Sequence, residues 1–301
     1  LAIESRNDII VNQHRTIFSS GTIIVDADLP SAGISRRINS FLLDGKTRPG
    51  NIPWIFHYGF RVDDYSDFGT QLTPRLGAIY KLSKQSVLKA LYGQSFRAAS
   101  AVELGDTAFI MGDPNIKPEE LDTYELVYLR QTNDARYEVT LFHNDLTNGI
   151  TNVADQFRNV SESRSEGVEL GYSKKFTSLL IESSASYVDS EDVTNETKYY
   201  AFPKYIINLG LGYYFPQNWI LYVNNRVHLS ANENTTANAP ALKDYWRVDV
   251  NIRKTISEQV QLFANLRNAL NRDNYLPYLG STEGGIPENS ISFDAGVLYK
   301  F

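Results

Sequence analysis

Histidine and acidic residues are the side chains that could carry catalysis or hold a metal ion. The four histidines lie far apart in the chain, without Glu or Asp at metal-site spacing: His14, His57, His143 and His228. No glycine-rich phosphate loop precedes a helical pattern, and no serine can be matched to a base. We therefore predict no catalytic, cofactor or metal site, and an enzyme is the weakest functional interpretation.

Two groups of acidic residues could offer carboxylate oxygens to a hard cation such as Ca²⁺. The first group is Asp63, Asp64 and Asp67. The second group follows in the next long connection and consists of Glu103, Asp106 and Asp113. We interpret both groups as solvated loop residues, because charge runs outside regular structure usually face water.

The composition narrows the class of protein. The chain of 301 residues has no cysteine, which excludes disulfides, and its net charge of −6 gives no sign of nucleic-acid binding. No apolar run approaches the roughly 18 residues of a membrane-spanning helix. Aromatic residues make up 12% of the chain, which favours an antiparallel barrel over a helical enzyme. Because the first residue is Leu1 rather than Met, we expect a processed product or a fragment.

Apolar and polar residues alternate with a period of two along many segments, as in strands with one apolar face. In one of them Trp246, Val248, Val250 and Ile252 alternate with polar residues. Strands are predicted at about 36–44, 52–62, 73–82, 87–96, 120–130, 136–145, 163–174, 179–188, 204–215, 219–229, 244–254, 259–267 and 290–301. Because long amphipathic helices are missing, the fold class is all-β.

The connections between these strands alternate between short and long toward the C-terminus. The short ones are 83–86, 131–135, 175–178, 216–218 and 255–258. The long ones are 97–119, 146–162, 189–203, 230–243 and 268–289. Tight turns at one end and long loops at the other are typical of a transmembrane antiparallel up-and-down β-barrel, whereas soluble Greek-key sandwiches mix the two.

The faces of the strands support the same architecture. Arg247, Asp249, Asn251 and Arg253 share one face of one strand. A lumen enclosed by about thirteen strands is too wide for side chains to fill, so we expect this polar face to be wet and the apolar face to contact lipid. Aromatic residues also gather at strand ends, as in interfacial girdles. A soluble β-protein, the alternative, explains neither the loops nor the polar face.

Several segments, in this order along the chain, carry a family resemblance. They are DDYSDFG at 63–69, TPRLG at 73–77, LKALYGQSFRA at 88–98, DPNIKPEELDTYEL at 113–126, FRNV at 157–160 leading to EGVEL at 166–170, and LRNAL at 266–270. From about residue 54 to the C-terminus the chain resembles the barrel of TonB-dependent outer-membrane receptors.

The resemblance implies a barrel of about 22 strands whose lumen is blocked by a plug domain. Such receptors take up a scarce nutrient, usually a ferric siderophore and sometimes haem, cobalamin or a glycan, with energy supplied through TonB. It also implies location in the outer membrane of a Gram-negative bacterium.

The chain departs from this pattern in its N-terminal part and in its length. Residues 1–50 match poorly and could add one or two strands, so we place the receptor barrel at 51–301. Neither a plug nor a TonB-contacting segment is visible, and about 13 predicted strands fall short of about 22. We therefore expect the C-terminal part of a barrel, with TonB and a plug domain as partners only in the full-length receptor, and we expect this polypeptide alone not to transport in an energised way.

The C-terminus resembles the signal that barrel-assembly machinery recognises. An alternating apolar ladder runs from Ile291 and ends with Tyr299 and Phe301. We therefore expect these last two residues to act in assembly.

Ligand binding is expected in the long outer loops. One loop carries Phe109 and Met111, and another carries Arg272, Tyr275 and Tyr278. Aromatic rings and Arg suit an anionic, ring-bearing iron chelate through stacking and charge. These five residues are the candidate binding residues.

Three functions remain open at this point. The leading hypothesis is TonB-dependent uptake, most simply of an iron complex. The alternatives are a passive outer-membrane pore or structural barrel, and a receptor fragment without function. The sequence names no substrate.

Overall fold

The computed structural model describes residues 2–11, 14–28, 33–106, 109–199, 202–231, 242–276 and 285–300. The chain divides into two compact units. Unit 1 comprises Leu1–Val127, Phe142–Glu166 and Ser190–Thr197, and unit 2 comprises Tyr128–Leu141, Gly167–Asp189 and Lys198–Phe301.

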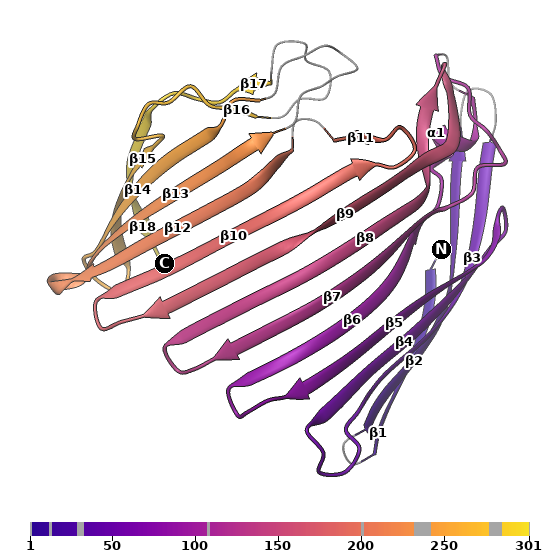
Figure 1. The fold of residues 1–301 in the computed structure, drawn as a ribbon, viewed down its shortest axis with the longest axis horizontal. Coiled ribbons are helices and arrows are strands. Elements are labelled where there is room, and N and C mark those ends of the chain that lie inside the picture. Colours follow the sequence, from indigo (N-terminus) through magenta and orange to yellow (C-terminus); the bar gives the residue numbers. More distant parts are fainter. Residues whose placement is uncertain are drawn as a thin grey trace. The chain divides into compact units, whose positions relative to one another are not determined.

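Unit 1 contains an antiparallel meander in which each strand pairs with the next along the chain (Figure 1). Its strands and its helix are β1 (Ala2–Val11), β2 (His14–Asp28), β3 (Gly33–Thr47), β4 (Trp54–Tyr65), β5 (Gly69–Lys81), β6 (Ser86–Arg97) and α1 (Ala101–Leu104). The next four strands contribute residues to both units: β7 (Glu119–Gln131), β8 (Ala135–Val153), β9 (Gln156–Lys175) and β10 (Leu179–Asp192). The two-residue strand β11 (Thr197–Lys198) pairs with β10.

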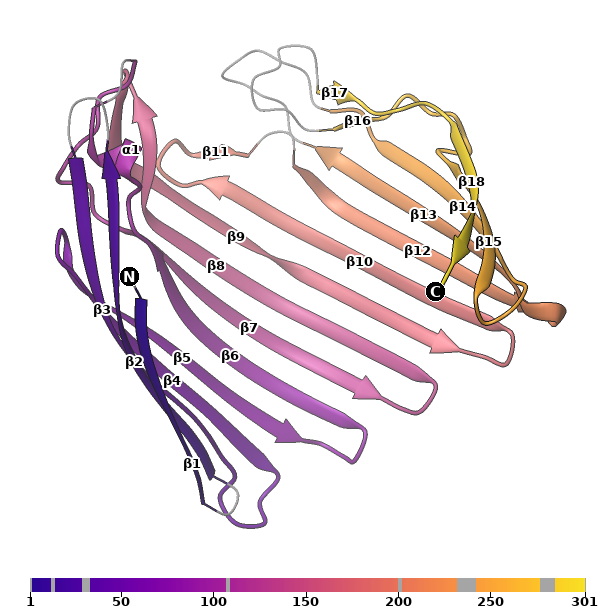
Figure 2. The same ribbon diagram turned by 180° about the vertical axis from the view of Figure 1, so that it is seen from behind.

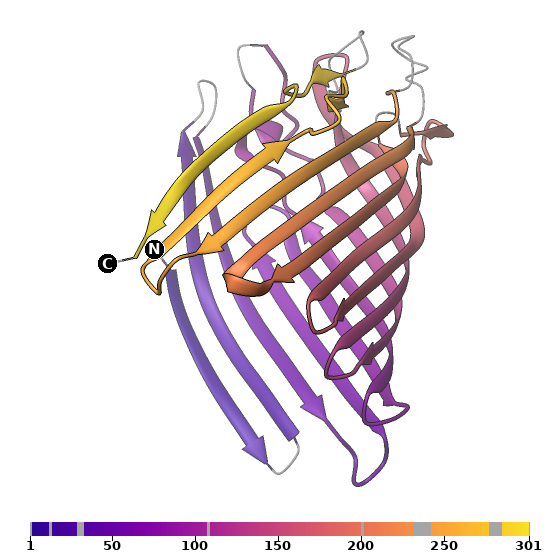
Figure 3. The same ribbon diagram turned by 90° about the vertical axis from the view of Figure 1, so that its left-hand side faces the viewer.

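Unit 2 continues with consecutive antiparallel pairing, and Figure 3 shows its orange and yellow strands side by side. These are β12 (Pro203–Phe215), the single 3₁₀ turn η1 (Pro216–Asn218), β13 (Trp219–Ala231), β14 (Tyr245–Thr255), β15 (Val260–Arg267) and β18 (Ser292–Tyr299). A separate small hairpin, β16 (Tyr275–Leu276) with β17 (Ile286–Pro287), lies at the ends of β13 and β14 (Figure 2).

The predicted all-β, up-and-down architecture is confirmed. Every strand predicted from the alternation is present, and each of these predicted strands pairs with the next predicted strand along the chain. The predicted short connections are tight turns, and we call that end of the strands the turn end and the opposite end the loop end. Among the described residues, no helix is long and apolar enough to cross a bilayer.

Residues 1–50 contain more strands than the one or two suggested by the sequence. Both β1 and β2 precede β3, and they pair in continuous register from Ala2 opposite Ile23 to Val11 opposite His14. Adjacent apolar residues in β2, such as Ile23 and Ile24, interrupt a two-residue alternation. The placing of a domain boundary near residue 50 stays a prediction.

The predicted long loop at 146–162 is instead a strand extension. The strands β8 and β9 continue through this segment to a two-residue turn, Ala154 and Asp155, whose φ angles are 51° and 63°. Two consecutive left-handed residues form the kind of turn that matches strand twist, but glycine and asparagine usually occupy it. Because neither residue signals this turn, the sequence pattern indicated a loop.

The two faces of the sheet differ in the way that the alternation predicted. On β14, Trp246 and Ile252 are 41% and 40% exposed, whereas the Arg247 side chain is 18% exposed and hydrogen-bonded. The apolar residues of this strand are therefore not packed in a dry centre. We call the side of the sheet that bears Trp246 and its equivalents the apolar face, and the opposite side the polar face.

Burial confirms that the apolar side chains form no interior core in the described part of the chain. The buried hydrophobic residues there are only Ala99, Ile116, Val127, Ala135 and Tyr245. Large exposed apolar side chains, in contrast, occur on every long strand from β4 onward. An apolar surface this extensive needs an apolar environment to cover it.

Candidate functional site

The segment after β6 is held by a charged cluster in unit 1. The Arg97 guanidinium donates from Nη1 and Nη2 to the Glu103 carboxylate at 2.9 and 3.0 Å, and from Nε to Glu119 at 2.5 Å. The Glu103 side chain is only 12% exposed and also accepts the backbone N–H and the hydroxyl of Ser100. Its place at the third position of α1 suits it to the N-terminal donors of that helix.

The expectation that Glu103 is a solvated loop residue is wrong. Burial raises the pKa of its carboxyl, but the hydrogen bonds from Arg97 and Ser100 outweigh burial and hold that pKa below its ordinary value. Glu103 is therefore an ionised anchor that ties α1 to the loop end of β6.

Within the first acidic group, Asp63 of β4 is structural rather than solvated, whereas Asp64 is exposed as expected. Asp63 is 1% exposed and accepts hydrogen bonds from the Ser40 hydroxyl and from Nε of Arg61. Asp67, in the short connection to β5, forms an ion pair with Arg36 at 2.6 Å. The described residues contain no group of His, Asp and Glu side chains arranged to hold a metal ion.

Two predicted binding residues, Phe109 and Met111, lie in unit 1 on the segment that follows α1. Phe109 is 89% exposed and Met111 is 52% exposed. The backbone of Met111 forms a parallel bridge with Gln156: its N–H donates to the Asp155 carbonyl and its carbonyl accepts the Phe157 N–H. The β8–β9 hairpin therefore supports this segment and leaves both apolar side chains open to solvent.

Two further predicted binding residues, Arg272 and Tyr275, lie in unit 2. The Arg272 guanidinium lies 5.5 Å from the centre of the Trp246 ring, within the range of a cation–π interaction. Tyr275 is half-buried and pairs with Pro287 in the β16–β17 hairpin. Tyr278 lies outside the described residues.

Two buried asparagines fix the segment that carries Arg272, and the sequence analysis assigned them no role. Asn268 is 1% exposed, and its amide bonds to backbone groups of Arg272 and Asn289. Asn274 is 2% exposed and bonds to the backbone N–H and carbonyl of Trp246 at 3.1 Å each. Asn268 falls in the LRNAL motif, which is the one signal that pointed to it.

A polar network joins β14 to the long connection before β18. Arg247 bonds to Asp249 on its own strand and to Glu288 from the long connection before β18. Glu288 also accepts the Tyr245 hydroxyl at 2.9 Å, and the Tyr245 ring stacks on His228 at 4.6 Å. His228 is therefore a packing residue in this structure.

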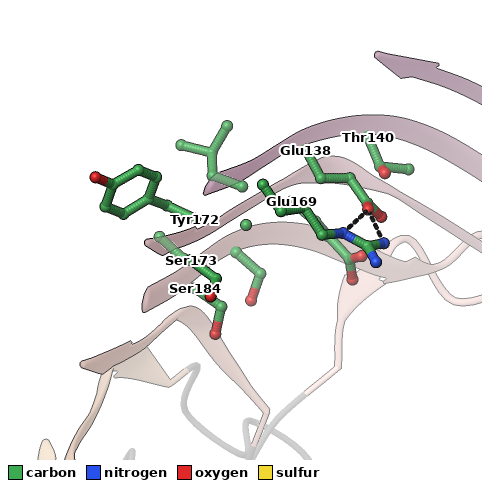
Figure 4. A pocket seen from close by; sticks show the side chains of 11 residues that line it. Glu138, Thr140, Glu169, Tyr172, Ser173 and Ser184 are labelled. Carbon is green, nitrogen blue, oxygen red and sulfur yellow. Dashed lines mark hydrogen bonds and ion pairs between the residues drawn. The ribbon is translucent and has the colours of Figure 1, made fainter. Parts of the chain in front are cut away.

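A hollow of about 420 Å³ opens at β8, β9 and β10 in unit 2. Glu138, paired with Arg136, and Glu169 extend to the same side, whereas Tyr172 points the other way (Figure 4). Thr140, buried, also lines the hollow. The polar face thus carries ordered charges in this part of the sheet.

Comparison with known proteins identifies the class of this chain. Residues 12–269 match the family model of the TonB dependent receptor-like β-barrel. The chain belongs to this family of TonB-dependent receptor barrels, as the sequence motifs indicated.

The curated relatives that it resembles include a transporter and an outer membrane virulence protein. It is 23% identical over 263 residues to the vitamin B12 transporter BtuB of Vibrio cholerae, which covers 82% of this chain and 40% of that protein. It is 25% identical over 185 residues to an iron-regulated outer membrane virulence protein of the same species, which covers 52% of this chain and 28% of that protein. The chain therefore spans well under half the length of these curated relatives.

Solved receptors share the fold along the whole chain. A mutant of the ferric enterobactin receptor of Pseudomonas aeruginosa superimposes with a TM-score of 0.82 at 16% identity, covering 100% of this chain and 53% of that chain. The siderophore receptor PirA of Acinetobacter baumannii gives a TM-score of 0.82 at 15% identity, covering 100% of this chain and 54% of that one. At these sequence identities the structural similarity shows the fold alone.

Proposed function

We propose that this chain is part of an outer-membrane receptor that takes up an iron complex, a ferric siderophore above all, with energy supplied through TonB. The observation that carries the proposal is the exposed apolar face of a sheet that belongs to the receptor-barrel family. In the outer membrane of a Gram-negative bacterium, hydrocarbon would cover that face and the polar face would line the lumen.

The nature of the loop surface supports an iron chelate as the ligand. Phe109 and Met111 offer exposed apolar contacts, and Arg272 adds a positive charge in another loop. The Arg272 guanidinium lies against Trp246, on the face that we assign to lipid, so Phe109 and Met111 carry more of the proposal. Anionic chelates with aromatic rings suit such groups. The solved receptors that share the fold include siderophore and ferric enterobactin receptors.

Cobalamin is the second candidate ligand. It is favoured by one observation, the similarity over 82% of this chain to vitamin B12 transporters. The proposed partners are the same for either ligand: TonB and a plug domain in the full-length receptor, outer-membrane lipid, and the barrel-assembly machinery. The assembly signal would be Tyr299, which is 59% exposed in β18, and Phe301, which lies outside the described residues.

An uptake experiment separates these functions. The complete gene that encodes this chain is expressed in a host lacking its own siderophore and cobalamin receptors, with and without TonB. We expect TonB-dependent growth on ferric siderophores as the iron source. Growth that depends on uptake of cobalamin instead would identify cobalamin as the ligand. Passage of ligands without TonB would favour a passive pore. No uptake of any ligand would favour a fragment without function.

The candidate loop residues are tested by measuring ligand binding to the same host cells. Phe109→Ala and Met111→Ala should each weaken ligand binding, because exposed contacts are lost without disturbing the backbone bridge. Val102→Ala is a matched control, since Val102 is an exposed apolar residue in α1 that we do not assign to binding. Equal binding by all three variants and the parent would remove this segment from the site.

A further inference from the structure

A second hollow, of about 240 Å³, lies on unit 1 near the loop ends of β4, β5 and β6. Its lining includes Arg61, Asp63, Tyr65, Arg75 and Phe96. The Tyr65 and Phe96 rings meet edge to face, with their centres 5.6 Å apart. The hollow therefore combines two guanidinium groups, one carboxylate and an aromatic wall.

Arg61 is only partly used by the protein. Its Nε donates to the Asp63 carboxylate at 2.7 Å, while the Ser40 hydroxyl binds the other oxygen of that carboxylate. Asp63 is buried, whereas the Arg61 side chain is 51% exposed. The two terminal amino groups of Arg61 have no hydrogen-bonding partner among the described residues, so Asp63 orients the guanidinium and leaves those donors free.

Arg75 stands beside Arg61 on the same face. In the β4–β5 register Arg61 is opposite Thr73 and Gly59 is opposite Arg75, so the two arginines are diagonal neighbours. On its other side Arg75 is opposite Gly93 of β6. Both of its direct cross-strand neighbours are glycines, and the Asp44 carboxylate lies over one of them, Gly59. Even so, Arg75 forms no ion pair in the described part of the chain.

Two arginines against one aspartate leave the hollow with one unbalanced positive charge. Guanidinium groups bind carboxylate and phosphate oxygens in pairs, with planar and specific geometry. A pocket for a whole drug-sized ligand occupies roughly 300–1,000 Å³. The hollow is smaller than that, so it suits one anionic group of a larger ligand.

We propose that Arg61 and Arg75 form an oxyanion subsite on the polar face of β4 and β5. It binds a carboxylate or a comparably placed pair of anionic oxygens. If the proposed function holds, the bound carboxylate belongs to the transported chelate. Only this assignment of the carboxylate to the chelate rests on the proposed function. Oxyanion binding by the chain is a separate property that can be measured without uptake.

The test is titration of the purified chain in detergent with citrate and with inorganic phosphate at low ionic strength. Arg75→Gln removes a guanidinium that has no ion-pair partner among the described residues, so folding should be preserved, and affinity for citrate should fall about tenfold or more. Arg75→Lys keeps the charge but not the paired donors, so its affinity for citrate should lie between those of the parent chain and Arg75→Gln. Phosphate alone binding well would identify a free inorganic oxyanion rather than a carboxylate-bearing ligand.

The control is Arg226→Gln, which removes another exposed arginine, on β13 of unit 2. Its affinity should equal that of the parent chain. Unchanged affinity in Arg75→Gln, or an equal loss in Arg226→Gln, would overturn the subsite, because the first shows that Arg75 makes no contact and the second shows only a general charge effect. Failure of uptake with intact citrate binding would instead reject the proposed function.

Discussion

The side chain of Asn268 closes a short backbone loop on Arg272. Its Nδ2 donates to the Arg272 carbonyl at 2.9 Å, and its Oδ1 accepts the Arg272 backbone N–H at 3.1 Å. The same Nδ2 reaches the Asn289 carbonyl, at the far end of the long connection, at 3.2 Å. One buried amide therefore holds both ends of the connection that presents Arg272.

Asn268→Ala should release this connection. The change removes three hydrogen bonds, at about 1 kcal/mol each, from a residue whose φ of 48° also favours asparagine over alanine. Amide exchange of residues 269–276 should become about 100-fold faster, which corresponds to about 3 kcal/mol. Asn208→Ala, which breaks one bond to Ser184, is the control, and equal exchange in the two variants would refute the anchoring role.

The lowered pKa of Glu103 makes the stability of the segment after β6 depend on pH. Because the pKa in the folded state lies below its unfolded value, ionised Glu103 stabilises the fold above the unfolded pKa. That contribution is lost as pH falls through the lower, folded pKa. We therefore expect the segment to loosen as pH drops below the ordinary Glu value of 4.5.

A single spin label can measure this loosening, because the chain has no cysteine of its own. A label at Val102→Cys should gain mobility as acid is added. Glu103→Gln should be mobile already at pH 7, with little further change, since the charge is gone. Glu125→Gln in β7 is the control, and a pH response that persists in Glu103→Gln would assign the transition to another group.

The alternation of residue types was sufficient to predict the long strands from β3 onward and their faces, but not β1 and β2. Val248 and Val250 alternate with Arg247 and Asp249 because successive side chains on a strand point to opposite sides, whatever the partner strand is. The turn at Ala154 and Asp155 was missed because it is selected by strand pairing and not by residue preference.

The buried carboxylates were missed for a related reason. Asp63 is satisfied by Ser40, and that contact exists only once β3 pairs with β4 in the observed register. An acidic residue has the same local sequence signal whether it is solvated or buried beside a distant hydroxyl. Partners far apart in sequence have to be placed by the fold before such a site can be recognised.

Close packing of Tyr222 over Gly210 yields a further prediction. A Cβ atom at Gly210 would lie 2.1 Å from the Tyr222 hydroxyl oxygen, which donates to Glu182 at 3.0 Å. Gly210→Ala should therefore displace the ring and lower the free energy of unfolding by about 1–3 kcal/mol. Combining it with Tyr222→Phe should cost less than the sum of the two changes, because the hydroxyl that clashes is then absent.

Denaturant unfolding of the purified chain in detergent measures these energies. Gly171→Ala is a matched control, since the nearest atom to its Cβ would be 3.5 Å away, an ordinary contact. Simple additivity in the double variant would show that the tyrosine is free to move aside.

The apolar face of β14 gives the most direct test of membrane insertion. Val250 and Asn251 are neighbours on one strand, and they point to opposite faces near its middle. A lysine on the lipid side of a transmembrane barrel costs about 2–4 kcal/mol at the bilayer midplane, whereas a lysine in the lumen stays hydrated. Val250→Lys should therefore destabilise the chain in phospholipid vesicles by about this amount, and Asn251→Lys should have little effect.

The free energy of unfolding from vesicles provides the comparison. Without lipid, in water-exposed conditions, the two variants should no longer differ in this free energy. If Asn251→Lys were the more damaging change in vesicles, the polar face would have to be the one that contacts hydrocarbon, and the receptor-barrel orientation proposed for this sheet would be reversed.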